Sequence, residues 1–293
     1  MAGVEARLSP ATARQMRLIL FGAAVIGLLI GVNNVVLHVT TDPLADVHAY
    51  YDAGARLNAG APLYVQAAGT NDPGFYRYPP LLAIAFRPLA LLPWPLAAAI
   101  WETLLVVAFG LTIRRLGWRP PVWLAVGILA MPIAWSLVVG QAQVLVTALL
   151  VVGMPWALAF AVHLKLLPAL AALYWVGRRD WESLARFAAW VVVLIGVQLL
   201  LEPAATVAYL GFPNLVQVGE VNNLSIYAVS PLLWAVLVVA GAVVTMRLGP
   251  TRYGWAAAVA LSVLATPRLL AYQLSTLIAG LRAPAPARDE GEP

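Results

Sequence analysis

The sequence predicts an all-α, polytopic helical membrane protein, and three observations support this fold class. Of its 293 residues, 62% are apolar and 11% are charged, whereas an ordinary soluble domain is about half apolar and one quarter charged. Apolar runs of about 20 residues recur along the chain, and each can cross a bilayer core roughly 30 Å thick as a helix. The basic residues lie between these runs, which is typical of membrane proteins and not of a nucleic-acid-binding patch.

The sequence also argues against several kinds of functional site. The chain has no cysteine, so it predicts neither a disulfide framework nor a thiolate metal site. It carries no metal-ligand spacing, no glycine-rich phosphate loop and no nucleophile elbow. We therefore expect no cofactor, no metal and no nucleic-acid partner.

The N-terminal region sets the expected orientation. Residues 1–17 carry three arginines and one glutamate, which predicts a cytoplasmic flank in a multi-pass protein of the plasma (inner) membrane. The apolar run 18–39 is too long for a signal-peptide core, so we interpret it as a retained first helix. We expect a membrane domain over residues 18–281 and a disordered tail over 282–293.

The polar stretch 40–79 should then be an external loop, and a second external loop is expected at 202–230. A short amphipathic surface helix is predicted within the first loop over residues 43–59, with Asp42 as its N-cap and Pro43 at its first position. Gly60 should end it.

Asp46 is the candidate carboxylate of this loop. Asp42 is expected to cap the helix, and Asp52 has Arg56 one turn further on. Asp46 has no such partner and shares an otherwise apolar helix face with Tyr50. A carboxylate in that position needs a different explanation.

The rest of the chain contains further apolar segments, some of which proline or glycine should break. Pro88 should interrupt the first of them, Gly153 and Pro155 the long run, and Pro267 the last. We expect about eight to ten membrane segments in all. After the first helix they are 78–92, 95–113, 122–139, 144–176, 187–201, 231–246 and 255–281.

Lys165 is the only lysine, and it lies deep in an apolar run. A cation there costs several kcal/mol unless it is paired or faces a wet cavity. It either snorkels, pairs with a carboxylate such as Glu102, or meets an anion such as the phosphate of a lipid carrier. Arg87 and Arg268 either snorkel or join the same anion site. His163, on another helix face, is typical of a satisfied core histidine.

Several short motifs resemble those of glycosyltransferase family 87, within the GT-C superfamily. In order they are Asp46 followed by Tyr50, the run Gly60-Ala61-Pro62-Leu63-Tyr64, Tyr78-Pro79-Pro80-Leu81, Pro88-Leu89-Ala90, Gly140-Gln141 and Lys165-Leu166-Leu167-Pro168. The similarity covers residues 20 to 275 and is most specific in the first third. Tyr272 stands where the resemblance leads us to expect a histidine.

The resemblance implies a GT-C-like fold and an inverting hexosyltransferase, specifically a mannosyltransferase of the cell envelope. It would take a sugar from a polyprenyl-phosphate donor and pass it to a lipid or glycan acceptor on the outer face. The family's catalytic aspartate matches Asp46, the general base. Lys165 and Arg268 would neutralise the donor phosphate. Tyr50, Tyr78 and Gln141 would shape the pocket, although Gln141 also fits a helix cap or an interfacial hydrogen-bonding residue.

Two other functions remain open at this point. The chain is shorter than the family usually is, which fits an inactive protein that binds a polyprenyl-phosphate lipid or a partner membrane protein. A transporter of an anionic lipid or solute could use Lys165 at the midplane, but the sequence has no inverted repeat.

Overall fold

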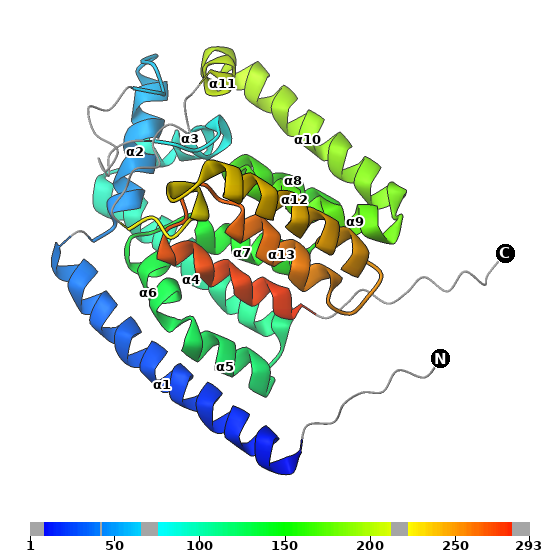
Figure 1. Cartoon of the computed structure of the whole chain (residues 1–293). Helices are drawn as coiled ribbons and strands as arrows, with labels where there is room; N and C mark the ends of the chain where they lie inside the picture. Colours follow the sequence, from blue (N-terminus) through cyan, green and yellow to red (C-terminus); the bar gives the residue numbers. More distant parts are fainter. Residues whose placement is uncertain (1–8, 42, 66–75, 212–221, 283–293) are drawn as a thin grey trace.

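The computed structural model describes residues 9–41, 43–65, 76–211 and 222–282. Within these ranges every regular element is an α-helix or a 3₁₀ helix, which confirms the all-α prediction (Figure 1). The α-helices are α1 (Pro10–Thr41), α2 (Ala45–Asn58), α3 (Pro80–Phe86), α4 (Trp94–Leu116), α5 (Pro120–Ile128), α6 (Ala130–Val138), α7 (Gln143–Val152), α8 (Pro155–Leu164), α9 (Leu173–Arg178), α10 (Trp181–Leu201), α11 (Pro203–Leu210), α12 (Pro231–Leu248) and α13 (Gly254–Leu264). The 3₁₀ helices are η1 (Leu89–Leu91), η2 (Leu167–Ala172), η3 (Ile226–Ala228) and η4 (Ala271–Leu281).

Helices long and apolar enough to cross a membrane are α1, α4, α10 and α12. Three more, α7, α8 and α13, are apolar but only 10–17 residues long. By length and composition, the described part of the chain thus holds four full spans, or five if α5 and α6 together form one, fewer than the eight to ten membrane segments expected. The chain is still a polytopic helical protein, with short apolar helices besides the full spans.

The segment 122–139 is not the single straight span that the sequence led us to expect. It is divided between α5 and α6, whose axes differ by 66°. Pro132 explains the break, because it lacks an N–H and its ring clashes with the carbonyl of Ile128 four residues earlier. The other predicted breaks are confirmed: Gly153, with φ 59°, separates α7 from α8, and residues 266–268 lie between α13 and η4.

The predicted surface helix is present as α2, two residues later than expected at its start. Its N-cap is Leu44 in a left-handed conformation, and Pro43 precedes the helix. The predicted cap Asp42 lies outside the described residues. One face of α2 is buried, with Val47, Ala49, Tyr50, Ala53, Gly54 and Leu57. This face packs on α3, η1 and α4, which fixes α2 against the membrane helices.

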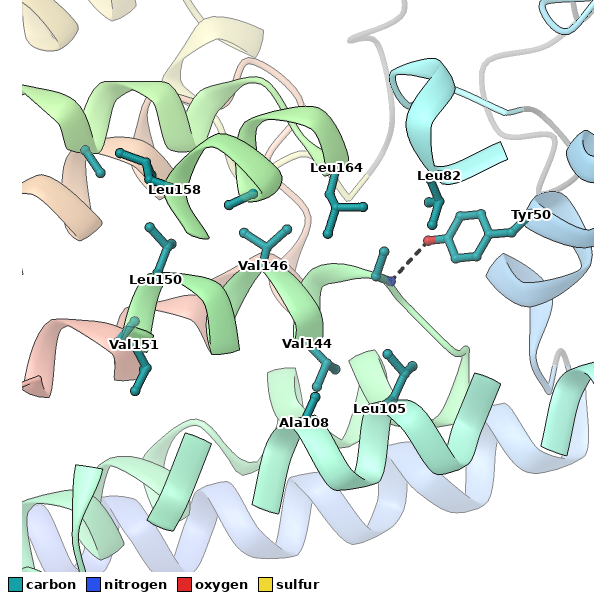
Figure 2. Close-up of a cluster of buried hydrophobic side chains, with 14 of the residues drawn as sticks. Tyr50, Leu82, Leu105, Ala108, Val144, Val146, Leu150, Val151, Leu158 and Leu164 are labelled. Atoms are coloured by element: carbon teal, nitrogen blue, oxygen red, sulfur yellow. Dashed lines mark hydrogen bonds between the residues drawn. The ribbon is translucent and has the colours of Figure 1, made fainter. Parts of the chain in front are cut away.

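The short helices form the centre of the protein. Helices α7, α8, α13, η2 and η4 pack against one another, while α10 covers α8, α12 covers α13, and α1 lies along α5 and α6 (Figure 1). Their apolar side chains meet in one buried cluster, in which Val146, Leu150 and Leu158 are at most 1% exposed (Figure 2). The candidate site residues Asp46 and Lys165 lie beside this core, at the start of α2 and directly after α8.

Candidate active site

A cavity of about 1120 Å³ opens where the ends of these helices meet. Its wall takes residues from α2, α6, α7, α8, η2, α10, α11, α12, α13 and η4, together with the turn before α3. Asp46, Tyr78, Lys165 and Arg268, which the sequence singled out, all line it. Segments far apart in the chain are therefore brought to one site.

Asp46 is held at the cavity wall by backbone contacts at the start of α2. The N–H of Asp46 donates to the carbonyl of Val139 at 3.0 Å, and the N–H of Leu44 donates to the carbonyl of Val138 at 3.0 Å. These two bonds join the beginning of α2 to the end of α6. Asp46 is half-buried as a result, and its position depends on tertiary contacts.

The electrostatics of Asp46 combine two opposing effects. The pKa of its carboxyl group is raised to about 6, because the effect of burial, which raises it, outweighs the positive charges of Lys165, Arg268 and Arg77, which lower it. A carboxyl group with this pKa is mostly ionised at neutral pH and can still accept a proton readily. These are the properties required of a general base.

Lys165 directly follows the last residue of α8 and is itself in an extended conformation. Its buried Nζ makes no hydrogen bond, and it lies 5.3 Å from the ring centroid of Tyr78 and 4.9 Å from that of Tyr272. Both distances fit a cation over an aromatic face. The alternative pairing with Glu102 is not formed, because the buried Oε1 of Glu102 has no partner either. Lys165 therefore presents its charge to the cavity.

Gln141 lies behind this wall, in the turn between α6 and α7. The turn depends on Gly140, whose φ of 71° favours glycine. The Tyr50 and Tyr78 hydroxyls both donate to Oε1 of Gln141, at 2.8 and 2.9 Å. The Ala142 N–H donates to the Tyr50 hydroxyl at 3.2 Å (Figure 2).

Of the three residues expected to shape the pocket, only one lines the cavity. Tyr78 is part of the cavity wall, whereas Tyr50 and Gln141 are fully buried and are not. Tyr50 and Gln141 instead fix the position of the Tyr78 ring, which in turn contacts Lys165.

Arg87 does not join the anion site. Its guanidinium donates to Glu202 Oε1 at 2.5 Å and to Asn58 Oδ1 at 3.0 Å, and the residue is not part of the cavity wall. The alternative that placed Arg87 with Lys165 is therefore wrong. His163 is 5% exposed and its Nδ1 is hydrogen-bonded to the carbonyl of Ala159 at 2.8 Å, as expected for a core histidine, and it is also part of the cavity wall.

Two site residues were not assigned a role from the sequence. Arg77 lines the cavity and acts electrostatically on Asp46. Its position next to Tyr78 could have drawn attention to it. The sequence marks Tyr272 only as a departure from the expected histidine, and no local pattern predicts that its ring faces Lys165. Among the described residues, no group of three or more His, Cys, Asp or Glu side chains could hold a metal ion.

The fold and the site together define a polytopic helical membrane protein in which, among the described residues, one carboxylate and several cations line a largely apolar cavity. The sequence pattern of glycosyltransferase family 87 matches residues 75–281, and the chain belongs to that family. The matched interval includes Tyr78, Gln141, Lys165 and Arg268, while Asp46 precedes it.

Curated relatives are mycobacterial proteins. The chain is 33% identical over 184 residues to a polyprenol-phosphate-mannose-dependent alpha-(1-2)-phosphatidylinositol pentamannoside mannosyltransferase of Mycolicibacterium smegmatis, covering 56% of this chain and 45% of the relative. It is 34% identical over 183 residues to the corresponding phosphatidylinositol mannoside mannosyltransferase of that organism, covering 50% and 42%. A pentamannoside mannosyltransferase of Mycobacterium tuberculosis is 30% identical, with 53% and 41% covered. The chain thus spans less than half the length of these relatives, and no solved structure matches it significantly.

Proposed function

We propose that this protein is a membrane glycosyltransferase that moves a sugar, mannose in the simplest case, from a polyprenyl-phosphate donor to a glycolipid or glycan acceptor on the outer face. The observation that carries the proposal is the meeting of Asp46, Lys165 and Arg268 at one cavity. The relatives are named for polyprenol-phosphate-mannose donors and phosphatidylinositol mannoside acceptors, which supports this choice of substrates.

In the proposed reaction, Asp46 accepts the proton of an acceptor hydroxyl while that oxygen attacks the anomeric carbon of the donor sugar. The bond between that carbon and the phosphate oxygen breaks, and the configuration is inverted. The departing phosphate carries negative charge, which Lys165, Arg268 and Arg77 stabilise from the cavity wall. A phosphate leaving group needs cations more than it needs a general acid, so one carboxylate suffices.

The remainder of the cavity suits a prenyl chain. Its wall includes Val191, Ile195 and Leu199 of α10 and Trp234 of α12. Both helices are long, apolar and little buried inside the protein. A lipid carrier approaching from the bilayer would therefore meet an apolar wall that leads to the cations.

Transfer of radiolabelled mannose from polyprenyl-phosphate-mannose to a membrane glycolipid by the purified protein is the direct test. We expect Asp46→Asn to abolish transfer while the protein remains folded and inserted. Asp52→Asn is the matched control, because Asp52 is exposed on the same helix and is not part of the cavity wall. Full transfer by Asp46→Asn would reject the assignment of the base. Donor binding without transfer by the wild-type protein would favour a binding protein instead.

A further inference from the structure

Three polar residues of the cavity wall have no role in the reaction described above. Gln143 of α7 and Gln273 and Thr276 of η4 all line the cavity, among mostly apolar neighbours. Gln143 is 5% exposed and Thr276 is 1% exposed. The Oε1 atom of Gln143 has no hydrogen-bond partner. A buried polar atom without a partner is costly, so this one calls for an explanation.

The unpartnered atom of the Gln143 side chain is a hydrogen-bond acceptor, because its amide nitrogen already donates within the protein. Gln143 Nε2 donates to Thr276 Oγ1 at 2.6 Å, Thr276 Oγ1 lies 2.8 Å from Thr147 Oγ1, and Thr147 Oγ1 donates to the Gln143 carbonyl at 2.9 Å. With each hydroxyl giving its single hydrogen to the next group, all three bonds are made. If the amide were flipped, Thr276 would give its hydrogen to Gln143, and Thr147 could serve only one of its two neighbours. The closed ring therefore leaves Oε1 as an acceptor to which no group of the protein donates.

The winding of η4 arranges this polar group in a line. Eleven residues, Ala271–Leu281, are in 3₁₀ conformation, although such helices seldom exceed one turn. Residues three apart eclipse in a 3₁₀ helix, so Gln273 and Thr276 lie on one line along it. Tyr272, which contacts Lys165, immediately precedes Gln273. With a rise of about 2 Å per residue, Thr276 lies roughly 8 Å along the helix from Tyr272.

We propose that Gln143, Gln273 and Thr276 form a subsite that recognises the hydroxyl groups of the transferred sugar, with Gln143 Oε1 accepting from one of them. The inference rests on the proposed function, because it assumes that Lys165 takes the phosphate of the same donor. An open acceptor selects a hydroxyl donor and disfavours a second phosphate. The two ends of the site are thus chemically distinct, one cationic and one hydrogen-bond-accepting.

The test compares two probes, a short-chain polyprenyl phosphate and the same lipid carrying mannose, bound to the detergent-purified full chain. We expect the wild-type protein to bind the mannosylated lipid about tenfold more tightly. Gln143→Met, which keeps the length of the side chain and lets Thr276 retain its bond to Thr147, should reduce that preference about fivefold. Its affinity for the unglycosylated phosphate should stay at the wild-type value. Thr276→Ser should keep the preference, because it keeps the hydroxyl, and Thr276→Val should reduce it.

The matched control is Thr112→Val, the same change at a buried threonine of α4 that is not part of the cavity wall. It should leave the binding of both probes unchanged. Equal binding of the two probes by the wild-type protein, or an undiminished preference in Gln143→Met, would overturn the subsite and leave the phosphate site standing. Failure of the wild-type protein to bind either probe would reject the proposed function itself. Monodeoxy-mannose lipids then identify the hydroxyl: the critical one lowers affinity in the wild-type protein and not in Gln143→Met.

Discussion

The ammonium group of Lys165 lies 4.9 Å from the centre of the Tyr272 ring and makes no hydrogen bond. The centre of the Tyr78 ring lies 5.3 Å from the same group. Two aromatic faces therefore hold the ammonium group in place, and it makes no direct hydrogen bond to a carboxylate. Its charge stays available to an incoming phosphate.

This relationship predicts that the ring of Tyr272 matters more than its hydroxyl group. Tyr272→Phe keeps the aromatic face, and we expect the KM for the donor to stay within about twofold of wild type. Tyr272→Leu removes that face, and a contact worth about 0.5–2 kcal/mol should be lost, which raises the KM roughly 2- to 30-fold. Steady-state transfer kinetics measure both values. Equal effects of the two substitutions would contradict a role for the ring.

The pKa of Asp46 predicts how the rate depends on pH. Burial raises this pKa to about 6, and a general base works only when it is deprotonated. We therefore expect kcat/KM to fall as the pH drops through about 6 and to reach a plateau above it. Because Lys165 lowers the pKa of Asp46, the Lys165→Met variant should show the same limb moved to higher pH, in addition to weaker donor binding. A pH profile without this limb would contradict the assignment.

The Arg87–Glu202 ion pair predicts an effect on stability that is separate from donor binding. The side chains are 38% and 18% exposed, and solvent screening limits such a pair to about 0.5–1 kcal/mol. Thermal unfolding of Arg87→Gln, Glu202→Gln and the double variant should give a coupling free energy of this size. Donor affinity should not change in Arg87→Gln, since Arg87 is not part of the cavity wall. A large loss of donor affinity would place Arg87 in the anion site after all.

The contact between α1 and α5 predicts opposite effects for two similar glycine substitutions. A Cβ atom at Gly27 would lie 2.2 Å from the carbonyl oxygen of Gly127, whereas one at Gly22 would have nothing within 4 Å. Gly27→Ala should therefore separate the two helices and destabilise the protein by about 1–3 kcal/mol.

Gly22→Ala is the matched control on the same helix. It should be neutral or stabilise the protein by up to about 1 kcal/mol, because alanine favours the helix. Thermal unfolding in the same detergent compares the two variants. A stability of Gly27→Ala equal to that of Gly22→Ala would show that the close approach of the helices does not form.

Local patterns in the sequence were enough for the long helices and for several of their breaks. Runs of about 20 apolar residues leave a membrane helix as the only structure that pairs every backbone group. Gly153 predicts a break because glycine adopts a positive φ without strain, and its φ in the structure is 59°. Pro132 likewise predicts the bend between α5 and α6, but the continuous apolar run around it led to the expectation of one straight span.

For the candidate site too, the sequence indicates some of the residues and only tertiary packing decides the rest. Asp46 could be selected from the sequence because a carboxylate without a local partner on an apolar helix face is unusual, and Lys165 because a lone lysine in an apolar run is costly. Their meeting at one cavity, the rings that hold Lys165 and the open acceptor of Gln143 were decided by tertiary packing. These contacts join residues about a hundred or more positions apart, and local periodicity carries no information over such distances.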